Sequence, residues 1–93
     1  MTEDEIKIYK AIRAYFKKQN LFMLVKIMRQ TYSRDIIGIA IRENKRYDGS
    51  IDYDFGIIHH IFGDECSYEK QGIYTAKTWR ETLKEACEFF GIK

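Results

Sequence analysis

The stretch that decides the fold spans residues 35–51 and has the sequence DIIGIAIRENKRYDGSI. Three β-branched side chains recur there at every second position, which is the period of a β-strand: Ile37, Ile39 and Ile41. Gly38 and Ala40 lie between them, and a glycine in the middle of the run argues against a helix. We therefore predict a strand over residues 35–42, with the isoleucines on one face and the small residues on the other.

Asp48-Gly49 is the strongest turn signal in the chain, because a two-residue hairpin turn requires positive φ at both positions and these residue types adopt it readily. The pair predicts a hairpin whose second strand runs from Ile51 to about Ile58. In that register Lys45 faces Asp52, so that opposite charges meet across the strands. Residues 57–62 fit either a continuation of this strand or a short helical turn.

A helix is expected at each end of the chain. Thr2-Glu3-Asp4-Glu5 matches a capping box, with acidic residues where the positive end of the helix dipole favours them. The helix that follows has its apolar residues on one face and ends near Asn20. Thr75 is expected to cap a final helix that ends at Gly91. The buried stripe of this helix comprises Trp79, Leu83, Ala86 and Phe90.

Two further segments are less regular. Residues 21–31 alternate imperfectly and predict a strand with Met23, Val25 and Ile27 directed inward. Residues 63–72 are polar and are expected to form a loop, followed at most by a short edge strand around residues 73–74.

The length and composition agree with one small domain. Ninety-three residues, 45% of them hydrophobic, support a single core. We predict one domain over residues 1–93 with an α+β fold, in the order α-β-β-β-α. In this fold a small antiparallel sheet of three to four strands is flanked by an N-terminal and a C-terminal helix, both packed on one face of the sheet.

Cysteine usage and hydropathy indicate where the chain works. Cys66 and Cys87 are the only cysteines, too few for a disulfide-stapled secreted domain. The N-terminus is acidic where a signal peptide is basic, and the longest apolar run is far too short to span a bilayer. These features predict a cytoplasmic protein with no membrane partner.

Charge is divided along the sequence, although the formal net charge is only +2. Residues 7–46 hold eleven Lys or Arg and two acids, whereas residues 47–69 hold six acids and neither Lys nor Arg. Two interpretations stay open. The blocks either form separate surfaces that attract partners of opposite charge, or they pair with each other across the hairpin and largely cancel.

Several side chains are of types used in catalysis or metal binding, but their spacing supports neither. His59 and His60 are adjacent in a strand, so they point to opposite faces, and they match no structural zinc spacing. Cys66 has no oxyanion turn or orienting residue to accompany a histidine base. Asp52 and Asp54 share a strand face, where balance by basic neighbours is a simpler explanation than acid–base chemistry. We therefore expect no enzyme activity, no catalytic residue, no metal site and no cofactor.

The leading functional hypothesis is a non-catalytic binding module that docks on a macromolecular partner, with a protein as first choice, and regulates or inhibits it. Acidic and aromatic side chains gather around the predicted hairpin, where they would give a docking surface apolar anchors ringed by charge. The expected contact residues are Tyr47, Asp48, Asp52, Tyr53 and Asp54. The size fits the small accessory proteins of phages and mobile elements, many of which block nucleic-acid-processing enzymes.

The alternative hypothesis is direct nucleic-acid binding. Basic residues on the outer face of the first helix have no acid beside them after the first turn, which leaves a positive field suited to phosphates. Together with the hairpin, the expected contact residues are Lys7, Lys10, Arg13, Lys17, Lys18, Arg42, Lys45 and Arg46. The pI of about 8.5 is lower than is usual for a dedicated nucleic-acid-binding domain.

Overall fold

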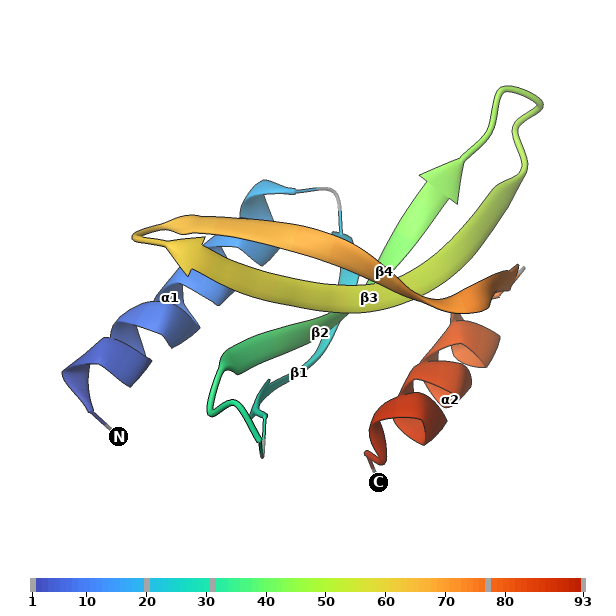
Figure 1. Cartoon of the computed structure of the whole chain (residues 1–93). Coiled ribbons are helices and arrows are strands. Elements are labelled where there is room, and N and C mark those ends of the chain that lie inside the picture. The colour runs from blue at the N-terminus through green and yellow to red at the C-terminus, as the bar shows by residue number, and fades with distance from the viewer. Residues whose placement is uncertain (1, 20, 31, 77, 93) are drawn as a thin grey trace.

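The computed structural model describes residues 2–19, 21–30, 32–76 and 78–92, which form a helix, four strands and a second helix (Figure 1). The elements are α1 (Glu3–Lys18), β1 (Leu21–Arg29), β2 (Ile36–Lys45), β3 (Ile51–Phe62), β4 (Glu65–Ala76) and α2 (Trp79–Phe90). The strands make one antiparallel sheet in the order β1-β2-β3-β4. The predicted α+β class is confirmed, with the sheet at four strands.

The predicted start of α1 is confirmed. The Thr2 hydroxyl accepts a hydrogen bond from the Glu5 amide at 3.2 Å, and the first turn is acidic, so the cap and the helix dipole both favour this start. At the other end the Gln19 amide donates to the Tyr15 carbonyl. Asn20, where the sequence suggested a stop, lies outside the described residues.

The helices cover opposite faces of the sheet, so the expectation that both pack on one face is wrong. Ile12 of α1 packs in a core cluster with Ala40 and Ile58. Ala86 of α2 packs in a second cluster with Ile41 and Phe55. Successive residues of a strand point to opposite faces, so neighbours Ala40 and Ile41 meet different helices. The physical reason is that β2 is buried on both faces from Ile36 to Ile41, and each face needs its own cover.

Gly38 allows α1 to approach the sheet closely. A Cβ atom at this position would lie 2.6 Å from Cγ2 of Ile12, well inside van der Waals contact. The small residues predicted on one face of β2 therefore form the floor on which α1 rests.

The inward set predicted for β1 is wrong in part. The β1–β2 register shifts twice, between Leu21 and Met23 and between Leu24 and Lys26. Each irregularity moves the following side chains to the other face. As a result Met23 and Val25 pack on the α2 side, whereas Ile27 packs on the α1 side.

The β2–β3 hairpin lies where Asp48-Gly49 predicts it, but its register differs by one residue. Lys45 pairs with Ile51, so the predicted Lys45–Asp52 pairing is wrong. The Gly49 amide donates to the Arg46 carbonyl at 3.1 Å, and the Arg46 amide donates to the Ser50 carbonyl at 2.9 Å. Only Gly49 has positive φ in this loop, at 85°. These bonds define a three-residue loop with glycine in the left-handed position, in place of the two-residue turn.

The segment after β3 is more regular than the sequence suggests. Residues 57–62 continue β3 as strand, which decides between the two alternatives. Residues 65–72 belong to the edge strand β4, so the predicted loop is wrong. β4 extends through Thr75, and the cap of α2 is instead Thr78, whose hydroxyl accepts from the Glu81 amide at 3.2 Å. α2 ends at Gly91 as predicted, with φ at 66°.

Within the described residues, α1 and α2 both fall short of the length and apolar character that a membrane-crossing helix needs.

Candidate functional site

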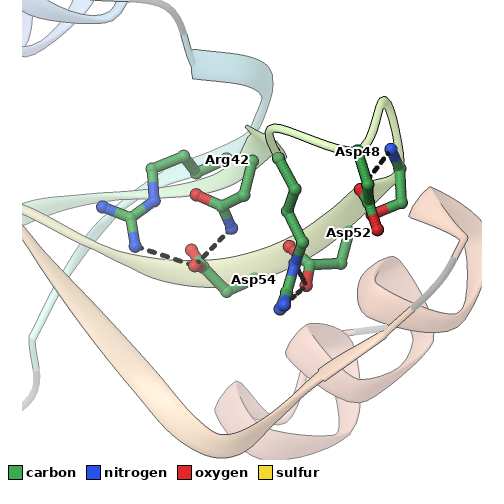
Figure 2. Close-up of polar contacts among 7 residues, drawn as sticks. Arg42, Asp48, Asp52 and Asp54 are labelled. Atoms are coloured by element: carbon green, nitrogen blue, oxygen red, sulfur yellow. Dashed lines mark hydrogen bonds and ion pairs between the residues drawn. The ribbon is translucent and has the colours of Figure 1, made fainter.

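Asp54, a predicted contact residue, lies inside the protein. Only 2% of it is exposed, on the α1 side of the sheet. Its carboxylate accepts three hydrogen bonds of 2.8 Å each, from the Arg42 guanidinium, the Asn44 amide and the Tyr68 hydroxyl. Figure 2 shows the first two of these bonds. A buried carboxylate with three donors is satisfied internally, so Asp54 supports the sheet and cannot touch a partner directly.

This network sets the ionisation of its members. Burial raises the pKa of Asp54, but the hydrogen bonds from Arg42, Asn44 and Tyr68 outweigh it and leave the pKa below 3.8. The hydrogen bond to Asp54 raises the pKa of Arg42. Burial and the bond to Asp54 raise the pKa of Tyr68 far above its ordinary value. The network therefore holds one carboxylate, one guanidinium and one neutral phenol at neutral pH.

The pKa of Asp54 is lower in the folded protein than in the unfolded chain. The ionised carboxylate therefore stabilises the fold at neutral pH, and this stabilisation is lost as the pH falls through the folded pKa. We therefore expect Tyr68→Phe, which removes one donor to Asp54, to lower the free energy of unfolding by about 1.5–3 kcal/mol at pH 7. The cost should shrink as the pH falls through the folded pKa of Asp54, which lies below its ordinary value. Urea unfolding over a falling pH series from pH 7 measures this, and a cost that stays constant until the protein unfolds in acid would contradict the assignment.

The other hairpin acids also have partners within the hairpin. Asp52 forms an ion pair with Arg46, whose Nε lies 2.9 Å from the carboxylate. Asp48 at the tip accepts from the Ser50 amide at 2.9 Å and from its hydroxyl, which lowers the Asp48 pKa (Figure 2). Opposite charges therefore pair across the β2–β3 hairpin, as in the second of the two interpretations of the charge blocks.

The five predicted docking residues are consequently not one surface. Tyr47 is fully exposed at the tip of the hairpin with Asp48, whereas Asp54 is internal. Tyr53 packs with the second core cluster, on the α2 face of the sheet. Of the predicted set, the hairpin tip and Tyr53 remain as candidate contacts on the outside of the molecule.

A second feature, the aromatic surface, was not found from the sequence. It consists of Phe22, Ile51, Tyr53 and Trp79, which come from β1, β3 and α2. The Phe22 ring centroid lies 5.5 Å from that of Tyr53 and 6.2 Å from that of Trp79. Phe22 is 40% exposed and Ile51 39%. The Arg80 guanidinium lies 5.2 Å from the Trp79 ring centroid.

A hollow of about 530 Å³ adjoins the aromatic surface, with Phe22, Leu21, Glu43 and Lys45 in its walls. Lys45 and Glu43 pair with each other at 3.9 Å. A cavity beside partly exposed rings can accept an apolar side chain from another molecule. Because Lys45 and Glu43 neutralise each other, a side chain that enters the hollow needs no charge of its own.

The predicted basic set divides into two groups. Five residues lie exposed on α1, and none of them forms an ion pair within the described part of the chain: Lys7, Lys10, Arg13, Lys17 and Lys18. The other three, Arg42, Lys45 and Arg46, lie on and next to β2 and pair with Asp54, Glu43 and Asp52. Only the α1 group leaves its charge without a counter-charge.

The histidines and cysteines form no clear reactive site. His59 lies 2.8 Å from Glu69, while His60 contacts the Gly63 carbonyl at 2.7 Å. His60 and Cys66 are cross-strand neighbours, but burial and the nearby Asp64 raise the pKa of the Cys66 thiol, which disfavours a thiolate. In the parts of the chain that the structure covers, no three His, Cys, Asp or Glu residues gather as metal ligands would.

No protein family, curated protein or solved structure matches the chain in sequence or fold comparisons.

Proposed function

We propose that the chain is a non-catalytic module that docks on a protein partner through the aromatic surface and regulates or inhibits that partner. The observation that carries the proposal is that Phe22, Tyr53 and Trp79 meet from three separate elements and remain partly exposed. Burying these rings in the core would stabilise the fold more than leaving them at its surface. Their exposure is therefore accounted for by a partner that covers them.

The composition of this surface supports a protein partner. Phe, Tyr, Trp and Arg are enriched at the centres of protein interfaces, and all four types occur here. The neighbouring charges on Lys45 and Glu43 compensate each other, which leaves Arg80 against Trp79 as the one cation among the residues named for this surface. Tyr47 at the hairpin tip extends beyond it as a further contact. We propose a nucleic-acid-processing enzyme as the class of partner, as for other small accessory proteins of phages and mobile elements.

The proposal predicts that Phe22→Ser weakens partner binding at least about tenfold, because ring removal at the centre of an interface is costly. Phe62→Ser is the matched control, since Phe62 is 80% exposed at the other hairpin, outside the aromatic surface. The measurement is affinity capture from the native host with the wild type and both variants, followed by titration of the purified partner. Trp79 is the only tryptophan, so its fluorescence reports directly on this surface.

Two results would contradict the proposal. One is equal partner binding by the Phe22→Ser and wild-type proteins when circular dichroism shows that both are folded. The other is a wild-type dimer that Phe22→Ser converts to a monomer, because the surface would then bind a second copy of the chain.

A further inference from the structure

Two adjoining hollows lie on the α1 side of the sheet, and the second of them shares Leu21 and Glu43 with the hollow beside the aromatic surface. The first, of about 620 Å³, separates α1 from the β3–β4 hairpin. The second, of about 380 Å³, lies between the end of α1 and Arg42 with Tyr68. Tyr15 and Gln19 line both, so the hollows meet at the last turn of α1. We call the two together the α1 groove.

Cations and aromatic rings both line the α1 groove. Lys10 and Lys18 line the first hollow, and Tyr15 stands between the two hollows. In the second hollow the Arg42 guanidinium lies 4.9 Å from the Tyr68 ring centroid. Lys10 and Lys18 have no ion-pair partner among the described residues, so their charges are free to meet an anion.

We propose that the α1 groove binds single-stranded nucleic acid. Lys10, Lys18 and the neighbouring α1 cations contact successive phosphates, while a base enters the groove against the Tyr15 ring. Grooves that track a single strand combine these two features, a positive path for the backbone and rings on which bases stack. This goes beyond docking on a protein and uses a different face of the sheet.

The far wall of the groove favours a single strand over a duplex. Asp64 and Glu65 line the first hollow opposite Lys10 and Lys18. A duplex laid on α1 would bring its second phosphate backbone toward these carboxylates, which repel it. A base from a single strand instead presents amino groups, and carboxylates accept hydrogen bonds from them. The groove thus has one side for phosphates and one for base edges.

The test uses the whole chain with a labelled single strand of about 12 nucleotides and with the duplex of the same sequence. Fluorescence anisotropy between about 50 and 200 mM salt should show single-strand binding at least about fivefold tighter than duplex binding, weakening as salt rises. Tighter duplex binding overturns the proposal. So does the absence of binding at about 50 mM salt.

Paired variants place the ligand in the groove. Lys10→Gln with Lys18→Gln should reduce the salt slope by roughly 0.7 for each lost phosphate contact, whereas Lys26→Gln with Lys84→Gln, on exposed residues elsewhere, should leave it unchanged. Tyr15→Leu should weaken binding about fivefold or more, while Tyr15→Phe keeps the ring and the affinity. Equal effects of the two lysine pairs, or of the two Tyr15 variants, overturn the proposal. Phe22→Ser should not change single-strand binding, which separates this site from the protein-docking surface.

Discussion

Replacing Asp54 with alanine is expected to lower the free energy of unfolding by about 2–4 kcal/mol, because three donors lose the acceptor that they share, although Arg42, whose side chain is 39% exposed, can still reach water. The Arg42 Nε is buried without a partner among the described residues, so the bond to Asp54 is the one that anchors the guanidinium on the sheet. Asn44 and Tyr68 lose an acceptor at the same time. Small domains are stable by about 5–15 kcal/mol in total, so the loss is a large fraction of the stability and should clearly lower the midpoint of thermal unfolding.

Asp52→Ala is the matched control, because Asp52 lies two residues away on the same strand face. Its partner Arg46 has a side chain that is 61% exposed, and an ion pair with such an exposed partner contributes about 1 kcal/mol or less. Urea unfolding of both variants measures the difference. A double variant, Arg42→Met with Asp54→Leu, should be more stable than Asp54→Leu alone, because no charge is left unpaired. Equal costs for the two alanine variants would mean that Asp54 is only a surface charge.

The hairpin shows why the sequence predicted the strands but misplaced the site. The Asp48-Gly49 signal located the turn, yet the loop has three residues instead of two and the pairing shifts by one. In the predicted register Asp54 lies opposite the acidic Glu43, which offers it no cation to pair with. In the observed register it lies opposite Arg42. A one-residue difference in turn length thus decides whether an acid is available to a partner or is part of the core.

The edge strand and the aromatic surface were missed for different reasons. The first eight residues of β4 include only two hydrophobic side chains, Cys66 and Tyr68, which both pack against the α1-side core. This half of the strand therefore carries little hydrophobic pattern, although it pairs with β3 along its length. Thr78 could have been recognised as the α2 cap, because Glu81 follows it by three residues as in a capping box. The aromatic surface has no comparable local signal. Its rings come from distant segments and meet only after the sheet forms.

The two proposed surfaces lie on opposite sides of the sheet, and this arrangement has a mechanistic consequence. The aromatic surface is on the α2 side, and the α1 groove is on the other. The main contacts proposed for a protein partner and for a single strand are therefore different residues, although Leu21 and Glu43 line hollows of both sites. For a partner that processes nucleic acid, a module of this kind can act by holding the strand away from the active site.

Gly56→Ala is expected to cost about 3 kcal/mol, at the upper end of what overpacking a core position costs. A Cβ atom on Gly56 would lie 2.3 Å from the Glu69 carbonyl oxygen and 2.6 Å from Cζ of Tyr68. The first contact is with the backbone of β4, which can move only if its pairing with β3 is disturbed. Displacing Tyr68 also pulls its hydroxyl from Asp54, so the substitution weakens the buried network as well.

Gly63→Ala is the control for Gly56→Ala, since Gly63 has positive φ but no atom within 4 Å of its added Cβ. It should cost about 1–2 kcal/mol from backbone strain alone.

A second comparison separates the two contacts at Gly56. Combining Gly56→Ala with Tyr68→Ala removes the ring but leaves the Glu69 carbonyl in place, so the added cost of Gly56→Ala should largely persist in thermal unfolding. If truncating Tyr68 abolishes that cost, the constraint at Gly56 comes from the aromatic ring and not from the β4 backbone.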